Sequence, residues 1–201
     1  MSREIIAILR GITPAEAPSM AEGLLEAGID KIEVPLNSPD PFDSIKGMLE
    51  VAAGRGLIGA GTVLSPDDVL RLSQIGAQMV VSPDMNPRVI VATKQAGMLS
   101  YPGVMTPTEA FGALRNGADG LKFFPANLVG PAGISAMKAV LPPDCKTYAV
   151  GGVGPENFGE WFAAGVAGFG IGSSLYKPGR ALDDVLARAR DMVAAYDAAR
   201  E

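Results

Sequence analysis

The sequence predicts an α/β protein folded as a single (β/α)8 TIM barrel domain over residues 1–201. Three observations carry this prediction: eight short apolar runs recur along the chain, segments with helical spacing alternate with them, and each unit takes about 25 residues. Strict alternation predicts a parallel sheet covered by helices, and eight units favour closure into a barrel. An open doubly wound sheet is the alternative, but no dinucleotide fingerprint or reversal of strand order supports it.

The expected strands are runs of apolar or β-branched residues, each followed by turn residues. They cover residues 5–9, 31–36, 57–61, 78–82, 98–102, 120–125, 147–152 and 168–173. The expected helices begin near residues 13, 38, 65, 86, 106, 130 and 154, and a last helix runs from about residue 181 to the end of the chain. Most of these starts place Ser, Thr or Asn before Pro, which suits an N-cap followed by the first helical position. Several of the helices end at Gly before the next strand.

The composition excludes several kinds of site. The chain is 48% hydrophobic and 19% charged, so it can bury a core and is too apolar to be disordered. It has one cysteine, Cys145, and no histidine, which argues against an internal disulfide and a cysteine-rich zinc site. No metal and no other cofactor is expected, and acid/base chemistry must fall to carboxylates, lysine, tyrosine or water.

The charge pattern narrows the class of partner. The net charge is −5, and the 17 lysines and arginines are scattered along the chain, so nucleic acid is not expected as a partner. The first apolar run, residues 5–9, is closed by Arg10 and is too short for a signal peptide or a membrane span. We therefore expect a cytoplasmic enzyme or binding protein that acts on a small molecule.

Chemistry in a barrel of this kind lies at the carboxyl ends of the strands. The polar and turn residues at those ends are Arg10, Glu33, Asn37, Thr62, Pro83, Lys122, Gly151, Gly152, Gly172 and Ser173. Some have ordinary explanations: Arg10 suits an exposed charge, and Asn37 and Thr62 suit turns. Glu33 and Lys122 do not, because each lies inside an apolar run.

Lys122 is the most informative of these residues. It follows Leu121 and precedes Phe123, whereas the other lysines, Lys31 and Lys177 among them, fall at strand entries, on helices or in loops where solvent is near. A buried charge either shifts its pKa or finds a partner. A purely structural role, in which Lys122 pairs with an acid or extends its ammonium outward to solvent, is one explanation. Two charges, Lys122 and Glu33, at the mouth of one barrel instead indicate a working pair.

These residues favour one reaction. A desolvated lysine has a depressed pKa, and its free amine attacks ketones to form an iminium that withdraws electrons. Glu33 is the internal carboxylate available as the base. Arg10 and Thr62 suit a substrate carboxylate, and the glycine turns after residues 147–152 and 168–173 suit a phosphate. The chemistry points to metal-free Schiff-base cleavage of a phosphorylated 2-keto sugar acid.

Six segments carry a resemblance to a known family: "IIAILRGITPAEA", "KIEVPLNSP", "GAGTVL", "SPDMN", "LKFFPA" and "AVGGVGPEN". Over about residues 4–180 the chain resembles the class I 2-keto-3-deoxy-6-phosphogluconate and phosphogalactonate aldolases. The resemblance implies a barrel, a homotrimer, and cleavage to pyruvate and D-glyceraldehyde 3-phosphate. By position it makes Lys122 the Schiff-base lysine and Glu33 the general acid/base. It places Arg10, Thr62 and Pro83 in the pyruvate pocket and Gly151, Gly152, Gly172 and Ser173 at the phosphate.

Two positions bear on which sugar is cleaved. Gluconate members carry an arginine where this chain has Asn37, and a threonine where it has Val150. Both differences resemble the galactonate branch, so a 2-dehydro-3-deoxy-6-phosphogalactonate substrate is expected. Cleavage of the gluconate epimer is the alternative. A phosphosugar isomerase or epimerase and a non-catalytic phosphosugar sensor are the two other hypotheses.

Overall fold

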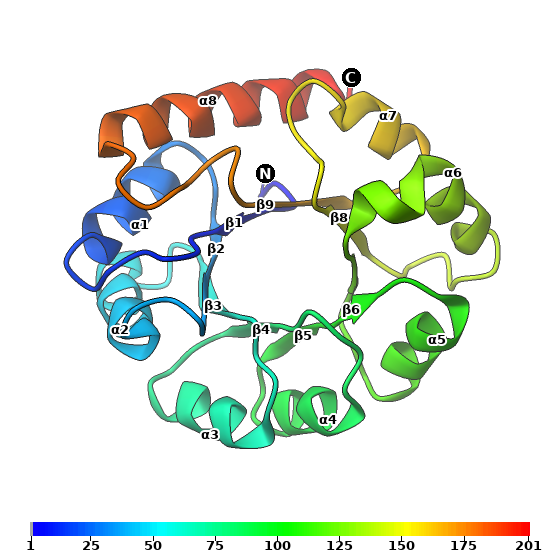
Figure 1. Cartoon of the computed structure of the whole chain (residues 1–201), viewed down its shortest axis with the longest axis horizontal. Helices are drawn as coiled ribbons and strands as arrows, with labels where there is room; N and C mark the ends of the chain where they lie inside the picture. Colours follow the sequence, from blue (N-terminus) through cyan, green and yellow to red (C-terminus); the bar gives the residue numbers. More distant parts are fainter. Residues whose placement is uncertain (1) are drawn as a thin grey trace.

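The computed structural model describes residues 2–201 and forms a barrel of parallel strands surrounded by a ring of helices (Figure 1). The strands are β1 (Ile5–Ile8), β2 (Lys31–Pro35), β3 (Leu57–Gly61), β4 (Met79–Val81), β5 (Leu99–Tyr101), β6 (Gly103–Val104), β7 (Leu121–Phe123), β8 (Thr147–Val150) and β9 (Gly168–Ile171). The helices are α1 (Ala17–Glu26), α2 (Pro41–Ala52), α3 (Pro66–Gln74), α4 (Pro87–Gln95), α5 (Pro107–Arg115), α6 (Ala126–Lys138), α7 (Phe158–Ala163) and α8 (Leu182–Ala198).

The barrel closes through a strand that is divided in two. β5 pairs with β4, and β6 pairs with β7, both in parallel register, while Pro102 separates the two halves. Proline has no N–H to donate, so the ladder is interrupted there. The Pro102 carbonyl still accepts a hydrogen bond of 2.9 Å from the Lys122 N–H. Nine short strands therefore occupy eight positions, and the predicted (β/α)8 barrel is confirmed. The expected strand over residues 98–102 is in fact split and reaches Val104.

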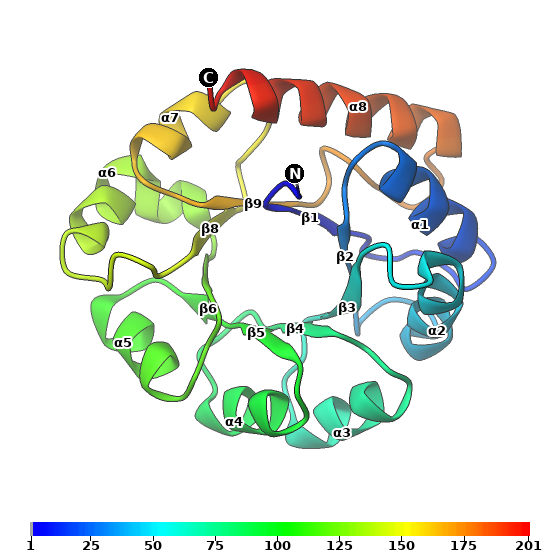
Figure 2. The same ribbon diagram turned by 180° about the vertical axis from the view of Figure 1, so that it is seen from behind.

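Three helix starts are capped as the sequence predicts. The side chains of Ser65, Asn86 and Thr106 accept backbone N–H bonds from the first turns of α3, α4 and α5. Four starts differ: turns precede α1, α2 and α7, which begin later than expected, and α6 begins four residues before Gly130. Gly130 has φ 70° and ψ 161°, so it interrupts α6. Figure 2 shows the same ring from behind, with α1 and α8 side by side.

Side chains fill the barrel toward its base, the end at which the strands begin. Ile6, Met79, Val81, Tyr101 and Tyr148 form a cluster inside it, separate from the main core between strands and helices. Glu4 closes the base, accepting hydrogen bonds of 2.8 Å from both Lys146 and the Tyr148 hydroxyl.

Lys31 corrects one expectation, because it is buried rather than near solvent. Its side chain is 7% exposed, and the ammonium lies 3.1 Å from the Asp30 carboxylate and 3.6 Å from the Glu4 carboxylate. It also donates to the Ser2 hydroxyl and the Arg3 carbonyl. These partners account for the burial of this second lysine as a structural contact at the barrel base. None of the described helices is long and apolar enough to cross a bilayer.

Candidate active site

Lys122 points into the barrel from the middle of β7. Its neighbours Leu121 and Phe123 are fully buried in the core between strands and helices, so strand alternation turns Lys122 to the interior. The residue is 6% exposed, and its Nζ lies 4.7 Å from the centroid of the Phe124 ring. This lysine is thus almost fully shielded from solvent and faces the same interior as Glu33.

Glu33 reaches that interior from β2 in the same way. Ile32 and Val34 pack outward, and Glu33 itself is 1% exposed. Its carboxylate lies over Gly61 of β3, where a methyl group would overlap it. The Oε2 atom is buried, and within residues 2–201 it has no hydrogen-bond partner. A buried oxygen with a free lone pair is available to a substrate hydroxyl.

The electrostatics of the pair follow from burial. Burial raises the pKa of Glu33 to about 7, although the positive charges of Lys122 and Arg10 oppose the shift. Burial also lowers the pKa of Lys122; the Glu33 carboxylate opposes this shift, while Arg10 adds to it. Near neutral pH, Glu33 can therefore both take and return a proton, and a larger share of Lys122 is the free amine.

A cavity of about 370 Å³ opens above Lys122. It brings together seven of the residues singled out from the sequence: Arg10, Lys122, Val150, Gly151, Gly152, Gly172 and Ser173. Glu33 lies below, lining a smaller internal cavity with Lys122 and Val150. The candidate reactive pair is thus at the bottom, and the glycine turns are at the side of the mouth.

The glycine turns present N–H groups because their carbonyls are occupied elsewhere. The Gly151 carbonyl accepts from the Asn127 N–H at 3.2 Å, and the Gly152 carbonyl accepts from Asn157 Nδ2 at 3.1 Å. Both glycines have positive φ, 97° and 72°, which a side chain would disfavour. No acceptor is found in the described part of the chain for the N–H groups of Gly152 and Ser173. Free N–H groups at a cavity suit an anion.

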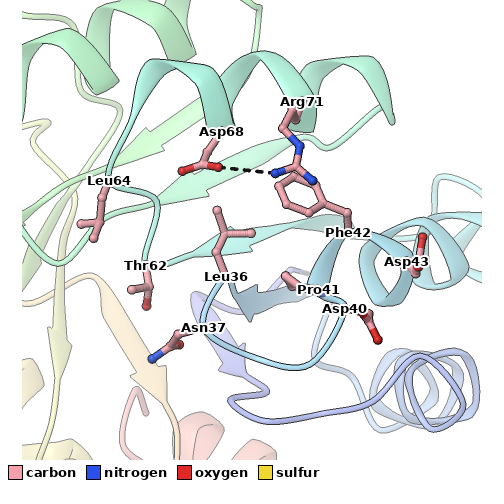
Figure 3. Close-up of a pocket in the computed structure, with 10 residues that line it drawn as sticks. All are labelled: Leu36, Asn37, Asp40, Pro41, Phe42, Asp43, Thr62, Leu64, Asp68 and Arg71. Carbon is pink, nitrogen blue, oxygen red and sulfur yellow. Dashed lines mark ion pairs between the residues drawn. The ribbon is translucent and has the colours of Figure 1, made fainter.

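Three predicted residues lie away from this cavity. Asn37 and Thr62 line a neighbouring pocket of about 570 Å³, where both stand at one end (Figure 3). Asn37 still touches the candidate site, because its Oδ1 accepts a hydrogen bond from Arg10. Thr62 has φ 55°, a left-handed conformation that β-branched residues rarely adopt. Pro83 lines neither pocket, and its carbonyl packs against Gly103 of β6.

The structure adds residues that the sequence did not single out as site residues. Ser174, Tyr176 and the exposed ammonium of Lys177 also line the 370 Å³ cavity. Lys177 has no ion-pair partner among residues 2–201, so it adds positive charge beside the glycine turns. Its place in the loop that follows the last strand, β9, was the available signal. Among the described residues, no group of three His, Cys, Asp or Glu side chains could hold a metal ion.

Comparison with known proteins gives the family. The family model described as KDPG and KHG aldolase matches residues 1–187 of the chain. The chain belongs to the KDPG and KHG aldolase family. It is therefore an aldolase, a carbon–carbon lyase. A Rhizobium meliloti relative named probable 2-dehydro-3-deoxy-6-phosphogalactonate aldolase is 52% identical over 198 residues, covering 98% of this chain and 93% of the relative.

Other relatives of the aldolase agree with this assignment. An Escherichia coli protein named 2-dehydro-3-deoxy-6-phosphogalactonate aldolase is 46% identical over 96% of this chain and 94% of its own. The Escherichia coli KHG/KDPG aldolase is 29% identical over 83% of this chain and 78% of its own length. A solved structure of native KDPGal superposes with a TM-score of 0.98 at 45% identity, over 100% of this chain and 97% of that one.

Replacing Gly61 with alanine should displace the Glu33 carboxylate, since the added methyl group would overlap it. We expect a fall in kcat of about 100-fold, the lower range for losing a positioned acid/base group. Steady-state turnover with Gly61→Ala tests this. The matched control is Gly159→Ala in α7, where an added Cβ meets nothing within 4 Å. Equal activity in the two variants would contradict the role of Gly61.

Proposed function

We propose that the aldolase cleaves 2-dehydro-3-deoxy-6-phosphogalactonate reversibly to pyruvate and D-glyceraldehyde 3-phosphate through a Schiff base on Lys122. The observation that carries the proposal is the buried Lys122 and Glu33 pair beneath a cavity that ends in glycine turns. The names of the two most similar relatives described above support the galactonate substrate.

The proposed steps use the groups already placed. The Lys122 amine adds to the C2 carbonyl, and loss of water leaves an iminium. Glu33 takes the proton from the C4 hydroxyl, the C3–C4 bond breaks, and its electron pair moves into the enamine. Glyceraldehyde 3-phosphate departs. Glu33 then returns the proton to C3, and water hydrolyses the iminium to release pyruvate and the free amine.

The remaining proposed site residues bind the two ends of the substrate. Arg10 lines the cavity and holds the carboxylate end, for which a guanidinium is the matching group. The family resemblance gives Thr62 and Pro83 the same role, although neither of them lines this cavity. The turns at Gly151–Gly152 and Gly172–Ser173 hold the phosphate through N–H groups. We also propose that Asn37 and Val150 set the preference between the C4 epimers.

Borohydride trapping tests the covalent step. Incubating the protein with pyruvate and borohydride should add one reduced three-carbon group to Lys122, detected by mass spectrometry of the intact protein and its peptides. An isomerase, an epimerase or a non-catalytic sensor would leave the mass unchanged. An unmodified protein, or an adduct on another lysine, would refute the mechanism.

Val150→Thr tests the substrate preference. Val150 lines both the mouth and the inner cavity, so an added hydroxyl would meet the substrate. We expect the ratio of kcat/KM for the galactonate over the gluconate epimer to fall about fivefold, the worth of one hydrogen bond near 1 kcal/mol. Val153→Thr, at the same cavity, is the control. An unchanged ratio in Val150→Thr would assign the preference to other residues.

We further propose that the aldolase works as a homotrimer in the cytoplasm. The family resemblance implies the trimer, and a designed cage that matches at TM-score 0.97 is described as a fusion of symmetric oligomeric domains. A phosphorylated sugar acid is charged and does not cross a bilayer unaided, which favours the compartment where it is made. Light scattering on the purified chain gives the oligomeric state, and a monomeric mass would contradict the trimer.

A further inference from the structure

The turn that follows β9 is held from behind mainly by Arg180, and Arg188 Nη1 adds one contact of 3.4 Å to the Ser174 carbonyl. Arg180 Nη1 donates to the carbonyls of Leu175 at 2.6 Å, Ser174 at 3.3 Å and Ser173 at 3.4 Å. Its side chain is only 15% exposed. Three successive carbonyls thus converge on one guanidinium, which lies outside the set of residues that line the cavity.

The geometry of the turn links those carbonyls to the cavity. The N–H groups of Leu175 and Tyr176 both donate to the Gly172 carbonyl, so the segment makes a single tight turn. Within residues 2–201, the N–H groups of Ser173 and Ser174 find no acceptor, and both residues line the cavity. In a peptide unit the carbonyl of one residue lies opposite the N–H of the next residue. The Ser173 carbonyl, held by Arg180, therefore turns the Ser174 N–H away from Arg180, and the Gly172 carbonyl, held by the N–H groups of Leu175 and Tyr176, sets the direction of the Ser173 N–H.

One further contact holds Arg180 itself, and another holds the loop that carries it. The Asp184 carboxylate, in the first turn of α8, forms ion pairs of 3.3 Å with both Arg180 Nε and Arg188 Nε. On the other side of the loop, Pro178 packs on Gly11, whose φ is 85° and where an added Cβ would lie 2.7 Å from Pro178 Cγ. The turn is therefore fixed both to α8 and to the loop that carries Arg10.

We propose that Arg180 is a positioning residue for the phosphate of the substrate: it binds the carbonyls of Ser173–Leu175, which fixes the turn and keeps the free Ser174 N–H directed at the phosphate. This inference rests on the proposed function, because the ligand of the turn is the phosphate of the keto acid. Arg180 does not touch the substrate. It acts through the orientation of the turn.

The test compares Arg180→Gln with Arg180→Lys. In Arg180→Gln we expect KM for the phosphorylated keto acid and the inhibition constant for inorganic phosphate each to rise about tenfold, as for losing a hydrogen bond to a charged group. The rate of borohydride trapping with pyruvate, which has no phosphate, should not change. Arg180→Lys should recover part of the affinity for phosphate, because lysine restores a charged donor but not the fork.

Arg55→Gln is the matched control. Arg55 also binds carbonyls, those of Val51 and Ala52, and pairs with Glu22, but it lies before β3 at the other end of the barrel. It should leave both phosphate constants unchanged. If Arg180→Gln does not fold, Asp184→Asn can replace it, because this change weakens the group that holds Arg180. We expect the same two phosphate constants to rise, but by less than tenfold.

The outcomes separate this inference from the proposed function. Unchanged phosphate constants in a folded Arg180→Gln, or an equal loss of trapping with pyruvate, would overturn the positioning role. A wild-type protein that binds inorganic phosphate in calorimetry but neither traps pyruvate nor cleaves the keto acid would overturn the proposed function instead. In that case the dissociation constant for phosphate in wild type and Arg180→Gln still decides the role of Arg180.

Discussion

Replacing Lys122 with methionine should abolish cleavage and leave the barrel folded. Methionine has about the length of lysine but no amine, so no iminium can form. We expect kcat to fall at least about 10⁴-fold, as for other enzymes that lose a covalent nucleophile. Stability should be retained or rise, because a nearly dry ammonium at 6% exposure is replaced by an apolar group. Pyruvate release and thermal unfolding measure the two effects.

Lys46→Met is the control for this variant. Lys46 is an exposed residue of α2, far from the barrel interior, so both activity and adduct formation should match the wild type. Residual activity of a few per cent in Lys122→Met, or an adduct that still forms, would show that another amine carries the reaction.

Glu33→Gln should have the second largest effect. Glutamine keeps the shape and a hydrogen-bonding oxygen but cannot take the C4 proton, so we expect kcat to fall about 10²- to 10⁴-fold. Lys122 remains, and trapping with pyruvate should still modify it. The wild-type rate should depend on an ionisation near pH 7, from the raised pKa of Glu33, and that inflection should vanish in the variant. A pH–rate profile identical in the two proteins would contradict the assignment.

The same group predicts how stability changes with pH. The pKa of Glu33 is about 7 in the folded protein and near 4.5 when unfolded. Below pH 4.5 both states are protonated, so the raised pKa costs nothing. As pH rises toward 7 the unfolded chain ionises first, and the folded state loses about 3 kcal/mol by linkage. Urea unfolding at pH 5 and pH 8 should show most of this loss in wild type and its absence in Glu33→Gln.

The barrel was predictable because the apolar composition of its strands indicates that they are buried. A parallel sheet covered by helices needs short apolar runs, and Ser65, Asn86 and Thr106 mark helix starts through local hydrogen bonds. What the sequence could not indicate depends on tertiary contacts. Pro102 interrupts a strand whose two halves pair with different neighbours, and the early start of α6 follows no capping side chain.

The residues of the candidate site also fall into those that the sequence indicates and those that only tertiary contacts reveal. Lys122 and Glu33 stand out because a charge in an apolar run is costly wherever the run lies. Gly61 and Arg180 do not stand out. Gly61 matters only because the register of β2 against β3 brings it under a carboxylate, and Arg180 only because its loop folds back on the turn after β9. Asn37 and Thr62 follow their strands as expected, yet they line the adjoining pocket, since a loop residue's direction is set by its own backbone.

The filled base of the barrel makes the candidate site a blind chamber. The interior cluster around Tyr101 and Tyr148, sealed by Glu4 and its partners, leaves the upper mouth as the route for every reactant. In the proposed mechanism, pyruvate held on Lys122 would occupy the inner end of that route, and the aldehyde would lie outside it. That mechanism then requires the aldehyde to depart before the ketoacid. In the synthetic direction the ketoacid must bind first. The aldehyde can react only after the ketoacid has formed its Schiff base on Lys122.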